Sequence, residues 1–176
     1  MSKPDMKLHR LPVFDNHYGR PEHWSGLQVD GLVAEPRTFS AADLETLAAT
    51  ILTDDFRCEE GWTVADQKWE GASLAAVLHV VRPLPDARYA EVSASDYSVV
   101  IPLTGAKQAL LAIKLNDDIL PEEHGGPCRL VLVGAACYTS IKWVDHIRLT
   151  AHRGTETAQR IASQRNRESK PDDHVL

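Results

Sequence analysis

The sequence lacks the features that would place this chain in a membrane or on nucleic acid. No stretch approaches the roughly 18 apolar residues of a membrane-spanning helix, and Met1–Met6 contains no apolar core of a signal peptide. The net charge is -6 and the pI about 5.7, whereas a general nucleic-acid binder needs a basic face. We therefore expect a cytoplasmic protein that binds neither membranes nor nucleic acid.

Cysteine is scarce as well. The three cysteines, Cys58, Cys128 and Cys137, are odd in number and form no CxxC pair, so neither a disulfide framework nor a zinc ribbon is indicated. A reducing compartment suits such a chain. We expect Cys128 and Cys137 to be buried and inert, and Trp62 and Trp69 to pack in the core.

Cys58 differs from the other two because charged residues flank it. It stands between Arg57 and Glu59, at the expected end of a strand. A structural cysteine usually has apolar neighbours, whereas a nearby arginine favours the thiolate, which attacks electrophiles and binds metals. From these neighbours alone, a structural role and a reactive role both stay open.

The rest of the composition predicts one ordered domain. With 176 residues, 43% of them hydrophobic and 25% charged, the chain can bury a full core. Helices are expected from Ser40 to about residue 51 and from Ser73 to Pro83, because serine is a good N-cap and proline ends a helix. A polar helix is expected within 155–167. Alternating apolar residues predict strands at 27–33, 53–58, 62–64, 89–94, 97–103, 111–115, 129–133 and 143–150. The pattern is typical of an α+β domain over residues 1–150, followed by a polar tail over 151–176 that is partly helical or disordered.

Five short motifs follow one another in a defined order. They are Cys58-Glu59-Glu60-Gly61-Trp62, Trp69-Glu70-Gly71-Ala72-Ser73-Leu74, Asp96-Tyr97 ahead of Ile101-Pro102-Leu103, His124-Gly125-Gly126-Pro127-Cys128-Arg129-Leu130-Val131, and Ser140-Ile141-Lys142-Trp143-Val144. Each is weak alone, but together the sequence resembles the molybdopterin-binding domain of the sulfite oxidase family over roughly residues 12–150. The resemblance implies that family's α+β, mixed sheet-rich fold and an oxidoreductase that uses a molybdenum-molybdopterin cofactor.

The resemblance also implies roles for individual residues. Cys58 would be the thiolate ligand of molybdenum, and a soft thiolate suits that metal. Arg129, with the loop Ser140, Ile141 and Lys142, would hold the phosphate of the pterin, because arginine offers a planar fork of donors and lysine a point charge. The residues that would contact the pterin itself are His124, Asp96, Asn16 and His17.

Two departures from the family pattern argue against sulfite as the substrate. Sulfite oxidases have an arginine directly before the Asn-His pair, where this chain has Asp15, and a carboxylate repels a dianion. Those enzymes also have a tyrosine beyond the Lys-Trp motif, whereas no tyrosine follows Tyr138. The sequence resembles the small stand-alone members, and its substrate-pocket candidates are Asp15, Arg57, Tyr97 and Tyr138. Of these, Asp15 and Tyr97 join Cys58 as candidate catalytic residues.

Two functions from different classes follow. The first is an enzyme that carries out a two-electron oxygen-atom transfer on a small molecule. It would exchange electrons with an unidentified partner protein, because no haem, flavin or iron–sulfur motif is present. The alternative is a non-catalytic module that binds the pterin or a partner, which the missing arginine and tyrosine would suit. We favour the enzyme, because a metal ligand and a phosphate site persist together.

Overall fold

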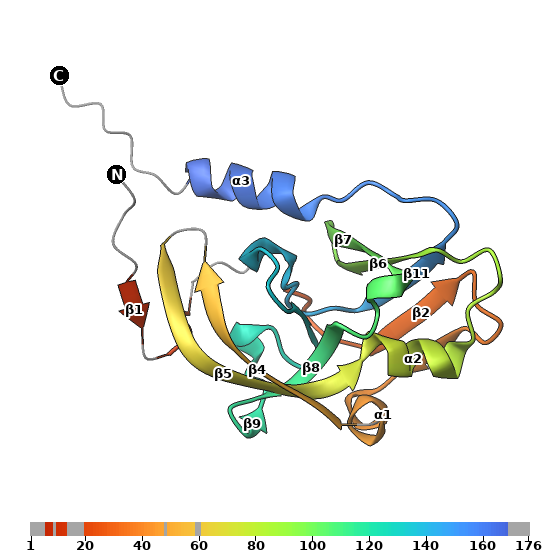
Figure 1. Ribbon diagram of the computed structural model, residues 1–176, viewed down its shortest axis with the longest axis horizontal. Helices are drawn as coiled ribbons and strands as arrows, with labels where there is room; N and C mark the ends of the chain where they lie inside the picture. Colours follow the sequence, from red (N-terminus) through yellow and green to blue (C-terminus); the bar gives the residue numbers. More distant parts are fainter. Residues whose placement is uncertain (1–5, 9, 14–19, 48, 59–60, 169–176) are drawn as a thin grey trace.

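The structure, a computed structural model, describes residues 6–8, 10–13, 20–47, 49–58 and 61–168. Within these residues the chain forms two sheets, with short helices at their margins (Figure 1). The strands that line the cavity described below belong to the first sheet. In the second sheet, the one parallel pair among the described strands joins distant parts of the sequence.

The first sheet is organised around its longest strand, β5. Among the described residues its strands are β1 (Met6–Leu8), β4 (Ala49–Cys58), β5 (Trp62–Ser73), β8 (Ala109–Leu115), β9 (Asp118–Ile119) and β10 (Arg129–Leu132). Strand β5 pairs antiparallel with β4 and β8 and parallel with β1, and β8 pairs antiparallel with β10. The hairpin of β4 and β5 is the long curved ribbon in Figure 1.

The second sheet has the strand order β3-β2-β11-β6-β7 among the described residues. Its strands are β2 (Leu27–Gly31), β3 (Arg37–Phe39), β6 (Tyr89–Ala94), β7 (Tyr97–Pro102) and β11 (His146–Thr150). Only the β2–β11 pair within this order is parallel, and all other pairs are antiparallel. The fold is therefore the mixed, sheet-rich α+β arrangement that the sequence predicts.

Strand β8 shows that the first sheet is buried on both faces. Its residues alternate between two core clusters: Leu111 and Ile113 belong to a large cluster shared with the second sheet, and Leu110 and Ala112 belong to a smaller one. Side chains on a strand point alternately to opposite faces. The smaller cluster, which also includes Trp62 and Trp69, lies on the face of the sheet that carries the site.

The helices begin where the sequence predicts, but one ends early. The α-helices are α1 (Ala41–Thr46), α2 (Leu74–Val81) and α3 (Ala158–Glu168), and the 3-10 turns are η1 (Leu103–Gly105), η2 (Glu122–His124) and η3 (Cys137–Thr139). The Ser40 hydroxyl accepts the Asp43 N–H at 3.1 Å, and the Ser73 hydroxyl accepts the Ala76 N–H at 3.1 Å, so both predicted N-caps are confirmed.

The prediction that the first helix continues to residue 51 is wrong. The helix ends at Thr46, and the chain enters β4 at Ala49. Ile51 pairs with Glu70 of β5 and its side chain is 57% exposed, so the helical spacing of apolar residues here does not mark a buried face. The backbone hydrogen bonds offered by β5 override the local helical preference.

Helix α3 is anchored by its first turn. Ala158 and Ile161 are buried, and the helix packs against β7 and η3. Just ahead of it, Thr157 Oγ1 donates to the Asp96 carbonyl at 2.6 Å and accepts from the Ser98 N–H at 2.8 Å. Figure 1 shows this helix lying along one side of the molecule, above η3. It therefore helps to hold η3, the turn that contributes Cys137 to the site.

Gly71 allows β5 and β8 to approach each other at a register shift. A Cβ atom at this position would lie 2.0 Å from the Leu111 carbonyl oxygen. We predict that Gly71→Ala lowers the free energy of unfolding by about 3 kcal/mol, because backbone rather than a flexible side chain must move. Urea unfolding of the two proteins measures this difference.

The matched control is Gly105→Ala, where the nearest atom to an added Cβ is Ile101 Cγ2 at 3.7 Å. This variant should stay within about 0.5 kcal/mol of the wild-type protein. Equal destabilisation by the two substitutions would contradict the steric explanation.

Candidate functional site

A cavity of about 460 Å³ lies between β4 and the segment that follows β10. Its volume falls in the range of small-molecule and cofactor sites. The lining residues come from β4, from Trp69 of β5 and from the segment that ends at Ser140. They are Leu52, Asp54, Asp55, Phe56, Arg57, Cys58, Trp69, Val131, Leu132, Val133, Gly134, Ala135, Ala136, Cys137 and Ser140.

Strand β4 presents Cys58 to this cavity. The strand has a register shift between Asp54 and Phe56, after which Phe56 and Cys58 both pack on the smaller core cluster. The Phe56 ring stacks on Trp62 with centroids 5.8 Å apart. Arg57 points the other way, and its side chain is 76% exposed. Strand alternation therefore places Phe56 and Cys58 on one face of β4 and Arg57 on the other.

Cys137 meets Cys58 at the cavity wall. The Cys137 thiol donates a hydrogen bond to Cys58 Sγ, with 3.4 Å between the sulfur atoms, and both residues are half-buried. The expectation that Cys137 is buried is wrong, and its expected inertness stays a prediction. The two residues are 79 positions apart, and no local feature around Cys137 signals the contact. Cys128 is fully buried, and burial raises the pKa of its thiol to about 12, in agreement with the inert role expected for it.

Arg129 lies behind two aromatic rings of the cavity wall. It is the first residue of β10 and only 5% exposed, and its guanidinium carbon is 5.1 Å from the ring centroids of both Phe56 and Trp69. One Nη donates to the His124 carbonyl at 2.9 Å, but the buried Nε has no hydrogen-bond partner. Burial lowers the pKa of Arg129 to about 10, while electrostatic interaction with Cys137 and Tyr97 acts in the opposite direction.

Lys142 approaches Arg129 from the loop ahead of β11. Its Nζ donates to the Glu123 carbonyl at 2.8 Å and lies 5.6 Å from the Trp143 ring centroid. Burial, and then the charge of Arg129, lower the pKa of Lys142 to about 8. The pKa of His124 is lowered as well, first by burial and then by Lys142. We call Arg129 and Lys142 the cation pair.

Both the backbone conformation and the close surroundings of residue 125 require a glycine. Its φ is +100°, which favours glycine, and an added Cβ would lie 2.8 Å from Lys142 Cβ. The Gly125 carbonyl also accepts the Trp143 N–H at 3.0 Å. The glycine therefore lets the loop of η2 lie directly on the loop that carries Lys142.

No ion pair among the described residues includes either member of the cation pair.

The structure brings part of the predicted phosphate site together. Ser140 lines the cavity with Cys58, whereas Arg129 and Lys142 interact electrostatically with each other and are not among the lining residues. Ile141 turns away: its side chain is 2% exposed and packs in the large core cluster, and its carbonyl accepts the Leu130 N–H at 2.9 Å. The Ile141 N–H donates to the Thr139 carbonyl at 3.0 Å, so both backbone polar groups of Ile141 also have partners within the chain.

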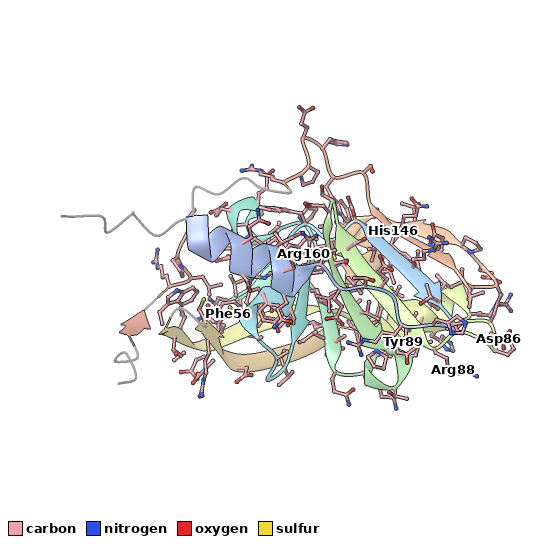
Figure 2. All side chains as sticks on the ribbon, turned by 90° about the horizontal axis from the view of Figure 1, so that it is seen from above. Phe56, Asp86, Arg88, Tyr89, His146 and Arg160 are labelled. Atoms are coloured by element: carbon pink, nitrogen blue, oxygen red, sulfur yellow. The ribbon has the colours of Figure 1, made fainter. Side chains whose placement is uncertain are left out.

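The remaining predicted residues are placed differently. The Tyr97 hydroxyl donates to the Tyr138 carbonyl at 2.6 Å, which ties β7 to η3, and Tyr97 is not among the lining residues of the cavity. Asp96 lies exposed in the β6–β7 turn and lines a second cavity of about 370 Å³ together with His146. Phe56 and His146 lie in different halves of the molecule (Figure 2). Asp15, Asn16 and His17 fall outside the described residues.

The donor set of the cavity fits a metal that is held by few protein ligands. The part of the chain that the structure describes contains no group of three or more His, Cys, Asp or Glu side chains that could hold a metal ion. A cofactor that brings its own sulfur ligands needs only one protein thiolate, and an unpartnered buried Nε of Arg129 beside this cavity suits an anionic group. Separately, none of the described helices combines the length and apolar character that crossing a membrane requires.

Comparison with known proteins agrees with the sequence motifs. The family model for the oxidoreductase molybdopterin binding domain matches residues 11–158. The uncharacterized oxidoreductase YuiH of Bacillus subtilis is 29% identical over 137 residues, which cover 76% of this chain and 69% of that protein. The catalytic subunit of the protein-methionine-sulfoxide reductase MsrP of Ralstonia nicotianae is 29% identical over 148 residues, which cover 73% of this chain and 44% of that protein.

A solved structure is similar in fold. The sulfane dehydrogenase SoxCD of Paracoccus pantotrophus superimposes with a TM-score of 0.66 at 23% sequence identity, over 72% of this chain and 38% of that chain. This chain thus spans less than half the length of both the reductase subunit and the SoxCD chain. The motif order, the mixed sheet-rich fold and the family match agree, and the chain belongs to the family of the oxidoreductase molybdopterin binding domain.

Proposed function

We propose that this chain is a molybdenum-molybdopterin oxidoreductase that transfers an oxygen atom to or from a small molecule other than sulfite. The observation that carries the proposal is the buried Arg129, whose Nε has no hydrogen-bond partner and which forms no ion pair with a described carboxylate. Its guanidinium lies against Phe56 and Trp69, two rings that line the cavity with the Cys58 thiol at its wall. Family membership supports the oxidoreductase class and the pterin.

The cation pair needs an anion. Burying a charge without a partner costs several kcal/mol, and two neighbouring positive charges add repulsion to that cost. The terminal phosphate of the pterin would relieve both penalties at once. Arg129 offers a planar fork of donors, Lys142 a single mobile charge, and Ser140 a hydroxyl at the adjoining cavity wall.

The protein groups around the cavity divide the remaining tasks. Cys58 would hold the metal at the end of β4, where the β4–β5 pairing fixes its backbone opposite Trp62. The bound molybdenum-pterin group supplies the two-electron oxygen chemistry. Phe56 and Trp69 form an apolar wall that excludes water from one side of the metal position, and Arg57 stands at the solvent side, 3.5 Å from Asp55.

The charge of Asp15 argues against sulfite as the substrate, because a carboxylate would repel a dianion. One relative is a protein-methionine-sulfoxide reductase subunit, which makes sulfoxides the first class of substrate to assay. That relative is a catalytic subunit, which supports a partner subunit for this chain too, and we propose that the partner exchanges electrons with it. A cytoplasmic location is part of the proposal and is supported by three cysteines that form no disulfide.

The metal assignment predicts that Cys58→Ser removes molybdenum. Protein made in cells with an intact molybdopterin pathway should contain about one molybdenum per chain, and Cys58→Ser less than about a tenth of that, because an alcohol is a much poorer ligand than a thiolate. Inductively coupled plasma mass spectrometry measures the content, and reduction of a sulfoxide with a dye as electron donor measures activity.

Cys128→Ala is the matched control, because Cys128 is buried away from the cavity lining. It should keep its molybdenum. Full retention of the metal in Cys58→Ser would overturn the role of Cys58. Wild-type protein that never takes up the pterin would favour the non-catalytic module.

The phosphate assignment predicts that Arg129→Met loses the pterin without unfolding. Each charge-assisted hydrogen bond contributes about 1.5–3 kcal/mol, so pterin content should fall at least about tenfold. The unfolding free energy of the cofactor-free protein should change by less than about 2 kcal/mol, because two effects oppose each other. Removal of an unneutralised buried charge stabilises the protein, and loss of its ring contacts destabilises it. Fluorescence of the oxidised pterin after release measures content, with the exposed Lys107→Met as control. Unchanged pterin content in Arg129→Met would contradict the assignment.

The depressed pKa of Lys142 predicts a specific pH dependence of stability. The pKa is about 8 in the folded protein and 10.5 in the unfolded chain. Between these values the unfolded chain binds more protons, so the contribution of Lys142 to the free energy of unfolding rises as pH increases from 8. In the cofactor-free protein, Lys142→Met should be more stable than wild type at pH 7, by about 1 kcal/mol after solvent screening.

This advantage of Lys142→Met should shrink by pH 9.5, as wild-type Lys142 loses its proton. Urea unfolding at pH 7, 8 and 9.5 measures the difference, and Lys107→Met provides an exposed lysine for comparison. A difference that stays constant across the three pH values would mean that Lys142 is not desolvated.

A further inference from the structure

We propose that Cys58 and Cys137 form a reversible disulfide in the cofactor-free protein, with Cys137 as the resolving thiol that protects Cys58 from irreversible oxidation. The value of protecting Cys58 rests on its proposed role as the metal ligand. The disulfide itself rests only on the contact between the two thiols, so the two ideas can fail separately.

The two sulfur atoms already touch. They are 3.4 Å apart, with the Cys137 thiol donating to Cys58 Sγ. Both residues are half-buried and line the 460 Å³ cavity, so a small oxidant can reach them. Cys128 is fully buried and does not line the cavity, which leaves Cys58 and Cys137 as the thiols exposed to it.

Closing the remaining gap requires a movement of η3 or a change of side-chain rotamer. A disulfide bond is about 2.05 Å long. The segment that leads into η3 can give way, because it is exposed and consists largely of small residues, Gly134, Ala135 and Ala136. Gly134 has no atom within 4 Å of an added Cβ, and Val133 is 50% exposed. Little packing on the segment from Val133 to Ala136 therefore opposes a small shift, although η3 itself is held by α3 and by the Tyr97 hydrogen bond.

The chemistry is balanced with a peroxide as the oxidant. The thiolate of Cys58 attacks one peroxide oxygen, the O–O bond breaks, and a sulfenic acid and one water form. The thiol of Cys137 then attacks the Cys58 sulfur, the S–S bond forms, and the S–O bond breaks to release a second water. Two thiols are oxidised by two electrons and the peroxide is reduced to two waters. Without Cys137, a second peroxide would carry Cys58 on to the sulfinic acid, which thiol reductants do not reverse.

The test treats cofactor-free protein, made in cells that lack the pterin pathway, with hydrogen peroxide. Accessible thiols are counted in denaturant with Ellman's reagent, before and after dithiothreitol. Wild-type protein should fall from three thiols to one and return to three, and mass spectrometry should show the loss of two hydrogen atoms and a peptide pair joined through Cys58 and Cys137. The Cys128→Ala control should fall from two thiols to none and return to two.

The Cys137→Ser variant separates a resolving thiol from a bystander. Its Cys58 should gain two oxygen atoms and should not regain a thiol with dithiothreitol, whereas wild-type Cys58 should recover fully. Wild-type Cys58 that reaches the sulfinic acid as fast as in Cys137→Ser, with no joined peptide pair, would overturn the proposal. So would loss of molybdenum from Cys137→Ser made under reducing conditions, since Cys137 would then be a metal ligand.

A second measurement links the disulfide to cofactor loading. Oxidised cofactor-free protein, mixed with molybdenum-molybdopterin released from another enzyme, should take up at least about tenfold less molybdenum than the same protein after dithiothreitol. If the disulfide forms but does not hinder uptake, the protective role fails together with the ligand role of Cys58. If Cys58→Ser abolishes uptake but no disulfide forms, only the proposal made here fails.

Discussion

The site depends on two positive charges that the protein does not neutralise by itself. Arg129 and Lys142 act on each other electrostatically, burial lowers the pKa values of both, and no ion pair among the described residues includes either. Two carbonyl oxygens of η2, together with aromatic rings, offset part of the cost. The rest of that cost is a reason to bind an anion, and this links the stability of the fold to its function.

The first sheet makes this arrangement possible because both of its faces are buried. Alternate residues of β8 and β10 enter different core clusters, so β10 can bury Leu130 on one face while Arg129 lies against Phe56 and Trp69 on the other. The β4–β5 pairing brings the end of β4 to the same region. The glycine-rich loop of η2 then packs against Lys142 because Gly125 has no side chain. Strand pairing and the close backbone approach at Gly125 thus determine the positions of the cation pair and of Cys58.

The thiols show a second consequence of placing a reactive group in an open cavity. A cysteine that is accessible to a cofactor is also accessible to oxidants. In this chain another thiol lies in contact with it, carried by η3, whose position is determined by Tyr97 and by α3. The same turn contributes to the cavity wall, so oxidation of the pair and access to the cavity depend on one short segment.

The sequence alone determined those features that depend on neighbouring residues. Both serine N-caps, the division of Phe56 and Arg57 between two faces of β4, and the order of the family motifs were readable because each rests on local hydrogen bonding or strand alternation. Tertiary structure decided the rest. The first helix stops at Thr46 because β5 offers the next residues a strand partner. Cys137 joins Cys58, and Asp96 faces a different cavity, because contacts between distant segments are set by how the sheets and η3 pack and leave no local trace in the chain.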